Sequence, residues 1–250
     1  MALLAWATAC GSSADASNKA PRRDARGETA FAPPESTKES TTRAGGRATA
    51  PASPTPDRTG APRVLFLGTS LTAGLGLDNP DSDAYPAVLQ RMADSAGVPA
   101  RVVNAGLSGE TSAGALRRAD WLLREKADAV VIETGANDGL RGLDPDSTAA
   151  NLRALIGKIR AANAATKIML VQMEAPTNLG ALYTRRFHAL FPGVAAAEGV
   201  TLLPFLLKDV GGIAKLNQPD GIHPTVAGAR IAARNIWPGI ERVLTNRAPR

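Results

Sequence analysis

The sequence contains few of the residues that bind transition metals or form covalent cross-links. Its 250 residues include one cysteine and two histidines. A zinc site built from cysteine and histidine usually takes roughly three or four such ligands, so we do not expect one here. A disulfide within one chain is also excluded, because a single cysteine has no second thiol to pair with.

Aromatic residues and clustered charge are scarce too. Aromatics make up 4% of the chain, and the net charge of +6 is spread along it. Residues 11–62 carry 8 Lys and Arg against 6 Asp and Glu, and the remaining residues carry 21 against 17. A protein that binds nucleic acid shows a basic stripe or aromatic side chains on which bases stack. We therefore predict no nucleic-acid partner.

The sequence also lacks a run of about 20 apolar residues, the length that a membrane-spanning helix needs. A shorter apolar run, "MALLAWATAC" at residues 1–10, ends in small residues and Cys10. Such a run is typical of a signal peptide, and a cysteine at this place resembles a lipoprotein signal, although no Lys or Arg precedes the run and Ala7 stands where leucine is usual. We expect an exported protein, periplasmic or anchored in the cell envelope through a lipidated Cys10; an incidental cysteine is the alternative.

Residues 11–61 are predicted to be a disordered linker. The segment is rich in Ser, Thr, Ala, Gly, Pro and charge, and it has a single aromatic residue, Phe31. It cannot bury enough apolar surface to offset the entropy lost on ordering. We place the folded domain at residues 62–250.

Apolar runs and amphipathic segments alternate from residue 63 onward. Runs rich in Val, Ile and Leu predict strands at 63–68, 101–106, 127–135, 167–173 and 200–205. Helical periodicity is found in segments 84–97, 111–126, 147–164 and 181–198. Nearly continuous apolar strands separated by helices are typical of a parallel sheet covered on both faces. We therefore expect an α/β fold, a three-layer α/β/α sandwich with a five-stranded parallel sheet.

The stretch "RVLFLGTSLTAG", residues 63–74, places Ser70 just past the end of the first strand. Serine often caps a helix N-terminus, because its side-chain oxygen accepts an orphan backbone N–H. It can also be a nucleophile at the carboxyl edge of the sheet, where open α/β folds form their sites. Both interpretations are open on this stretch alone.

A serine nucleophile needs a base, and histidine is the usual one near neutral pH. His188 lies in a helical segment among arginines and aromatics, where a structural role is expected. His223 lies in a loop, three residues after Asp220 and directly before Pro224, which we expect in the first turn of the next helix. This spacing lets the carboxylate reach the imidazole Nδ1, as the third member of a triad does; the alternative is a helix cap and an incidental histidine.

Acyl transfer also needs hydrogen-bond donors aimed at the developing oxyanion. The backbone N–H of Gly109, the side-chain amide of Asn137 and the backbone N–H of Ser70 are candidates. Each has an ordinary alternative: Gly109 as a turn glycine and Asn137 as an Asx turn that closes a strand. Their convergence on one edge of the sheet, in the roles that acyl transfer requires, favours the functional interpretation.

Four blocks, "GTSLTAG", "NAGLSGET", "GANDGLRG" and "DGIHP", together resemble the GDSL/SGNH hydrolases, and most closely the bacterial branch of multifunctional thioesterases, arylesterases and lysophospholipases. The resemblance covers about residues 62–245. It implies a flavodoxin-like fold with no metal or organic cofactor. It also implies that Ser70, Asp220 and His223 form the triad and that Gly109 and Asn137 line the oxyanion hole. The family's aspartate before the nucleophile is Thr69 here, so we expect the activity to remain and the pH profile to differ.

The expected activity is hydrolysis of carboxylic esters or thioesters (aryl esters, acyl thioesters or lysophospholipids) through a covalent acyl-enzyme. The partner is thus a small-molecule ester or lipid. Candidate acyl contacts follow the third and fourth strands, although core packing explains them equally well: Leu140, Met173, Pro176 and Leu179. A carbohydrate acetyl-esterase of the same fold is one alternative, and a non-catalytic binding module is another.

The interpretation of residues 1–10 predicts that their deletion changes the location of the protein. When cells are fractionated, we expect the full chain in the cell envelope or periplasm and the chain lacking residues 1–10 in the cytoplasm. A cytoplasmic location of both forms would contradict export.

Overall fold

The computed structural model describes residues 58–246. These residues form one compact unit. Cys10 and the predicted signal lie outside the described residues, as does the predicted linker up to residue 57, so those interpretations remain predictions. Within the described part of the chain, no helix has both the length and the apolar character needed to cross a bilayer.

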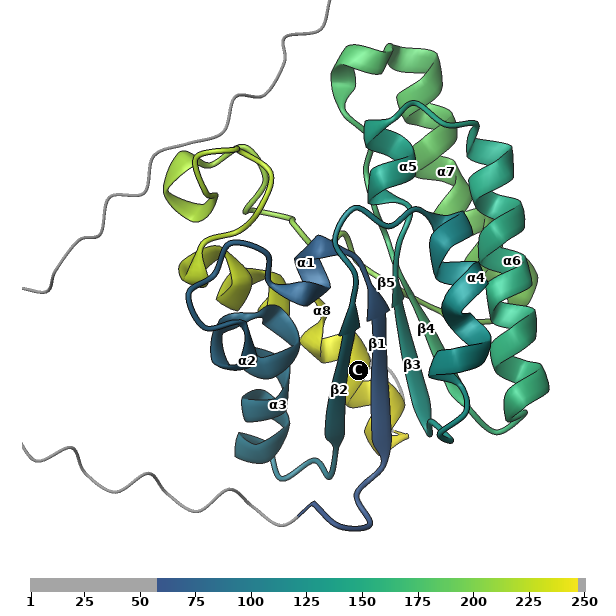
Figure 1. Cartoon of the computed structure of the whole chain (residues 1–250), viewed down its shortest axis with the longest axis vertical. Helices are drawn as coiled ribbons and strands as arrows, with labels where there is room; N and C mark the ends of the chain where they lie inside the picture. The colour runs from purple at the N-terminus through teal and green to yellow at the C-terminus, as the bar shows by residue number, and fades with distance from the viewer. Residues whose placement is uncertain (1–57, 247–250) are drawn as a thin grey trace, which may run out of the picture. The chain divides into compact units, whose positions relative to one another are not determined.

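Five parallel strands form one sheet in the order β2-β1-β3-β4-β5 (Figure 1). The strands are β1 (Arg63–Gly68), β2 (Arg101–Gly106), β3 (Ala129–Glu133), β4 (Lys167–Val171) and β5 (Thr201–Leu203). The predicted α/β fold with a five-stranded parallel sheet is thus confirmed. The chain runs from β1 to one side and then crosses back to β3, so the strand order reverses between these two strands. Open α/β sheets form their sites at this point, beyond the carboxyl ends of the strands.

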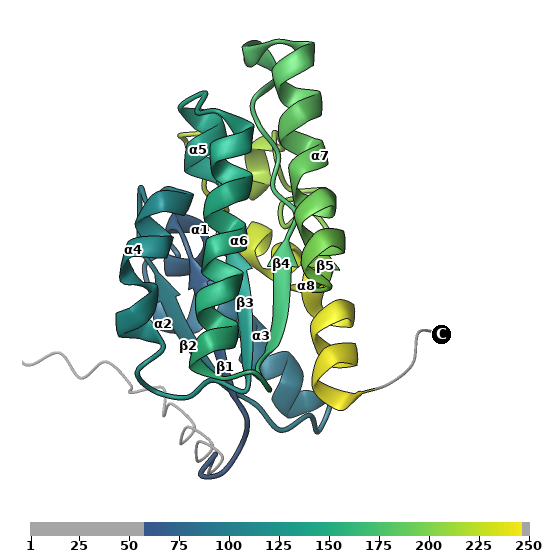
Figure 2. The same ribbon diagram turned by 90° about the vertical axis from the view of Figure 1, so that its right-hand side faces the viewer.

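Helices cover both faces of the sheet. They are α1 (Ser70–Ala73), α2 (Pro80–Asp83), α3 (Tyr85–Ser95), α4 (Ser112–Leu122), α5 (Ala136–Leu140), α6 (Pro145–Ala162), α7 (Ala181–Glu198) and α8 (Val226–Thr245), with short 3-10 turns η1 (Thr177–Leu179) and η2 (Ala214–Leu216). Helices α3 and α8 pack together on one face, and α4, α6 and α7 pack side by side on the other (Figures 1 and 2). Because all five strands are parallel, their carboxyl ends lie at one edge of the sheet.

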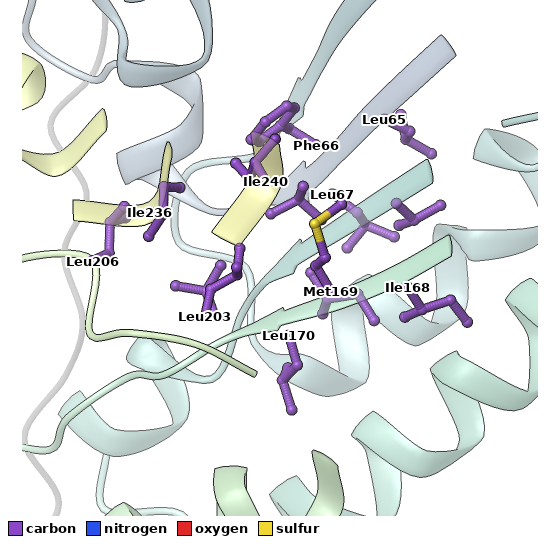
Figure 3. Close-up of a cluster of buried hydrophobic side chains, with 14 of the residues drawn as sticks. Leu65, Phe66, Leu67, Ile168, Met169, Leu170, Leu203, Leu206, Ile236 and Ile240 are labelled. Atoms are coloured by element: carbon purple, nitrogen blue, oxygen red, sulfur yellow. The ribbon is translucent and has the colours of Figure 1, made fainter. Parts of the chain in front are cut away.

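The core lies between the sheet and these helices. Every residue of β1 and β3 is buried, as expected for central strands covered on both faces. Figure 3 shows Phe66, Met169 and Leu203, from three strands, beside Ile236 and Ile240 of α8. This apolar packing makes the sheet a rigid base for the loops at its carboxyl edge.

Three strands are shorter than the sequence predicts. Strand β4 ends at Val171 rather than at residue 173. Strand β3 ends at Glu133 rather than at residue 135, because Gly135 has a left-handed backbone with φ of 99° and turns the chain into α5. Strand β5 is Thr201–Leu203 rather than 200–205. It is an edge strand paired only with β4, and Pro204 has no N–H to continue the ladder.

Glycines end β1 and β2 because the turn after β1 packs directly on them. A Cβ at Gly68 would lie 1.9 Å from Thr72 Oγ1, and a Cβ at Gly106 would lie 2.2 Å from the backbone nitrogen of Ala73. Both distances are far below van der Waals contact. The missing side chains therefore allow the single helical turn α1 to sit against the ends of two strands.

Candidate active site

Ser70 is the first residue of α1, immediately beyond β1. The N-cap residue of this helix is Thr69, and no side chain makes a capping hydrogen bond there. The interpretation of Ser70 as a helix cap is therefore wrong. Its Oγ lies 2.9 Å from Nε2 of His223, a residue 153 positions further along the chain.

His223 in turn contacts Asp220. The imidazole Nδ1 lies 2.6 Å from Asp220 Oδ2, and Asp220 Oδ1 accepts the backbone N–H groups of Ile222 and His223 at 2.9 and 3.0 Å. Asp220 lies in a loop and caps no helix. Since a carboxylate only accepts hydrogen bonds, Nδ1 carries the proton and Nε2 is left to accept from the Ser70 hydroxyl. The three predicted side chains therefore form one continuous hydrogen-bonded chain.

Gln218 holds the loop that carries Asp220 and His223. Its backbone N–H donates to His223 O at 2.7 Å, and its side-chain amide donates to Pro224 O at 3.0 Å and to Leu75 O, just after α1, at 2.7 Å. The histidine loop is thus fastened to the segment that follows the serine.

The prediction that Pro224 lies in the first turn of α8 is wrong. Pro224 pairs with Asn217 in an isolated antiparallel bridge, so its backbone is extended. The N-cap of α8 is Thr225, whose side chain accepts from the Gly228 N–H at 3.4 Å. The proline therefore ends the loop and precedes the helix.

Asp220 is ionised over the pH range in which most hydrolases work. The side-chain hydrogen bond from His223, followed by the backbone N–H groups of His223 and Ile222, lowers the pKa of Asp220 to about 2. A carboxylate that stays negative beside the imidazole stabilises the imidazolium that forms when histidine takes the serine proton.

The two other predicted donors come from the ends of β2 and β3. Gly109 lies in the turn after β2 with φ of 76°, so it is a turn glycine as well as an oxyanion candidate. Asn137 is in α5, and its side-chain amide donates to Glu110 O at 3.0 Å, so it forms no Asx turn. Arg141 Nη2 donates to Gly109 O at 2.9 Å. These bonds tie the Gly109 turn to α5.

Ser70 and His223 border a small cavity whose other walls are apolar. Its lining comes from α1, α3, α8 and the loops beside them: Leu71, Gly74, Leu75, Leu77, Ala84, Tyr85, Leu206, Leu207, Pro224, Ala229 and Ala232. Sequence patterning missed these residues as site candidates, because nothing distinguishes them from ordinary core leucines and alanines.

The predicted substrate contacts do not line this cavity. Met173 is only 2% exposed, so it is a core residue, as the packing alternative allowed. Leu140 is exposed on α5, while Pro176 and Leu179 are half-buried near η1. The other histidine, His188, is exposed on α7 and contacts Glu174, with 2.7 Å between Nδ1 and Oε1, so it has no place in the site.

Two buried carboxylates lie next to the site: Asp138, which the sequence places at this edge of the sheet without a role, and Glu133, which the sequence analysis missed. Asp138 accepts the backbone N–H of Ser112 at 2.8 Å and its hydroxyl at 2.5 Å. Glu133, at the end of β3, is completely buried against the turn that carries Ser70. A charged residue inside the apolar run "ADAVVIETG" is the signal that could have identified Glu133. Among residues 58–246, no group of three His, Cys, Asp or Glu side chains is placed to hold a metal ion.

Comparisons with known proteins show which sequences the chain resembles. Residues 66–231 match the model of the GDSL-like Lipase/Acylhydrolase family. Over 185 residues the chain is 42% identical to the esterase TesA of Pseudomonas aeruginosa, covering 74% of this chain and 90% of that protein. It is 39% identical to a protein of Escherichia coli named thioesterase 1/protease 1/lysophospholipase L1, covering 66% and 76%, and 34% identical to an arylesterase of Vibrio mimicus, covering 65% and 80%.

Solved structures show the same similarity. The esterase EstA of a Pseudoalteromonas species, in a form inhibited by monoethylphosphonate, superposes with a TM-score of 0.69. It is 34% identical in sequence, and the match covers 74% of this chain and 99% of that one.

Replacing Asp220 by Asn tests the third member of the hydrogen-bonded chain. We expect kcat for ester hydrolysis to fall by about 10³–10⁴, because the amide favours the wrong histidine tautomer. The low pKa of Asp220 keeps the wild-type carboxylate ionised from mildly acidic to alkaline pH, so the comparison is made with this acceptor charged. Steady-state rates of both proteins measure the loss. A folded Asp220→Asn variant with the kcat of wild type would contradict the role of Asp220.

Proposed function

The chain belongs to the GDSL-like lipase/acylhydrolase family, and we propose that it is a serine esterase in which Ser70, His223 and Asp220 form the catalytic triad. The single observation that carries the proposal is the hydrogen-bonded chain from Ser70 Oγ through the His223 imidazole to Asp220, at 2.9 and 2.6 Å. A serine with its hydroxyl directed at a neutral histidine nitrogen has the base it needs to become a nucleophile.

The reaction proceeds in two steps, acylation of Ser70 and hydrolysis of the acyl-enzyme. His223 takes the proton of Ser70 as Oγ bonds to the carbonyl carbon of the ester or thioester, and then gives that proton to the departing alcohol or thiol. The acyl group is left on Ser70 as an ester. Water then loses a proton to His223 and attacks the same carbon, and the proton returns to Ser70 as the carboxylic acid leaves. No cofactor takes part in either step.

The oxyanion of each tetrahedral intermediate is held by the backbone N–H groups of Ser70 and Gly109 and by the side-chain amide of Asn137. The positive φ of Gly109 and the hydrogen bonds from Arg141 and Asn137 support this role, because they fix the turn before substrate arrives. Donors that are oriented in advance cost no reorganisation during the reaction.

The substrates we propose are aryl esters, acyl thioesters and lysophospholipids. The cavity beside Ser70 and His223 is apolar, but its volume of about 10 Å³ is that of a single water molecule, so the choice of substrate does not rest on it. The names of the relatives, which include an esterase, a thioesterase and lysophospholipase, and an arylesterase, point to the same classes. A carbohydrate acetyl-esterase is the alternative, and it requires a preference for acetyl groups.

We further propose that the enzyme works in the cell envelope. The support is the apolar run that ends at Cys10, together with the linker-like composition that follows it. Lipid esters are the substrates that an enzyme tethered beside a membrane meets most often, which favours lysophospholipids over cytosolic acyl thioesters. The fractionation of full and shortened chains tests the location.

Hydrolysis of p-nitrophenyl esters from acetate to palmitate tests the activity, with the wild type, Ser70→Ala and Asn137→Ala assayed together. Ser70→Ala should lose nearly all turnover, and Asn137→Ala should lose about 10²–10³ in kcat. The chain length with the highest kcat/KM identifies the acyl group that the enzyme prefers, and a strict preference for acetate would favour the acetyl-esterase. A folded Ser70→Ala variant with wild-type turnover would refute the mechanism.

A further inference from the structure

A buried carboxyl group that the proposed mechanism does not use lies directly beneath the nucleophile. Glu133 is the last residue of β3, pairs in register with Gly68 of β1, and has no exposed surface. Burying a carboxyl group without hydrogen-bond partners costs free energy. The donors that contact Glu133 therefore indicate what this side chain does.

Among residues 58–246, the hydrogen-bond donors to the Glu133 carboxyl group all come from the turn around Ser70. Glu133 Oε2 accepts the backbone N–H of Thr69 at 2.9 Å and the hydroxyl of Thr72 at 2.7 Å, and Oε1 lies 3.0 Å from the Thr69 hydroxyl. Thr69 and Thr72 stand on either side of Ser70 in the sequence. One carboxyl group therefore fastens the chain both before and after the nucleophile.

A second layer supports this arrangement. The hydroxyl of Tyr85, from α3, lies 2.7 Å from Thr72 Oγ1. Because the single proton of the Thr72 hydroxyl is directed to Glu133, Tyr85 donates to Thr72. Gly68 has no side chain, which leaves space for the contact between Glu133 and Thr72. A Cβ at Gly68 would lie 2.8 Å from Glu133 Oε2 and would also clash with Thr72.

The hold on the turn does not depend on the charge of Glu133. Burial raises the pKa of this carboxyl group, while the donors from Thr69 and Thr72 oppose the rise. The titratable group that faces the Glu133 carboxyl group is Tyr85. Among residues 58–246, no Lys, Arg or His forms an ion pair with Glu133. If Glu133 gains a proton, Oε1 can carry it toward the Thr69 hydroxyl, so Oε2 still accepts from Thr69 N–H and Thr72.

We propose that Glu133 is a positioning residue, which, through Thr69 and Thr72, holds the turn on which Ser70 faces His223. The proposal rests on the proposed function, in which Ser70 is the nucleophile. Its consequence is geometric. The Ser70 Oγ to His223 Nε2 contact of 2.9 Å depends on where α1 sits, and a displacement of about 1 Å in a catalytic group can cost on the order of 10²-fold in rate.

Two pairs of variants separate position from charge and from bulk. Glu133→Gln keeps an oxygen acceptor for Thr69 and Thr72, whereas Glu133→Met keeps the length and removes the acceptor. Thr72→Ser keeps the hydroxyl, whereas Thr72→Val keeps the shape and removes it. We expect Glu133→Gln and Thr72→Ser to keep kcat within about threefold of wild type, and Glu133→Met and Thr72→Val to lose about 10- to 100-fold with KM nearly unchanged.

The rate of labelling by a fluorophosphonate provides a second readout, because this reagent reacts with the serine and reports its reactivity separately from substrate binding. It should fall by the same factor as kcat in Thr72→Val. Rates are divided by the concentration of sites that can be labelled, so that unfolded protein does not count. Ile132→Val, which trims a buried neighbour of Glu133 in β3, is the control for destabilisation and should leave the corrected kcat and labelling rate unchanged.

The outcomes distinguish this proposal from the one on which it rests. If Ser70→Ala keeps its activity, the proposed function fails. If Ser70→Ala is inactive but folded Thr72→Val has the kcat and labelling rate of wild type, only the role of Glu133 is refuted. A loss in Glu133→Gln equal to that in Glu133→Met would also refute it, because the charge rather than the acceptor would then matter. Should Glu133→Met fail to fold, the comparison of Thr72→Val with Thr72→Ser still decides.

Discussion

The close approach of one helical turn to the ends of two strands is the constraint on which the rest of this site depends. Gly68 and Gly106 have no side chains, so the turn α1 lies against β1 and β2 at distances that any Cβ would forbid. The turn begins with Ser70 and is fastened from below by Glu133. A side chain carried by a rigid sheet edge is held more exactly than one on a free loop, and acyl transfer needs that accuracy.

The second half of the site arrives from far along the chain. Asp220 and His223 occupy a loop before α8, and short-range hydrogen bonds within this loop hold the carboxylate against the imidazole. Gln218 then joins this loop to the segment after α1. The hydrogen bonds from Asn137 and Arg141 join α5 to the turn after β2, which carries the proposed oxyanion donor Gly109. The site is thus assembled from three fixed pieces rather than from one continuous segment.

The strands and the contact between Asp220 and His223 could be predicted from the sequence, because each depends on residues that are close together in the chain. Apolar runs identified the strands, and the spacing of Asp220 and His223 indicated their contact. The missed features depend on contacts between distant segments. The role of Glu133 depends on residues more than 60 positions away, and the lining of the cavity depends on how α1, α3 and α8 meet. The sequence alone left the role of Met173 open, because a core methionine and one that contacts an acyl chain have the same local pattern. Pro224 was misplaced because its bridge with Asn217 leaves no local signal.

Capture of the covalent intermediate is the most direct test of the central claim that Ser70 is acylated during turnover. The wild-type protein would be mixed with a p-nitrophenyl ester, quenched in acid within one turnover, digested and examined by mass spectrometry. We predict a burst of p-nitrophenol equal to the enzyme concentration and an added acyl mass on the peptide that contains Ser70. Turnover with an acyl group on another residue, or with no acylated peptide at any time, would contradict the mechanism.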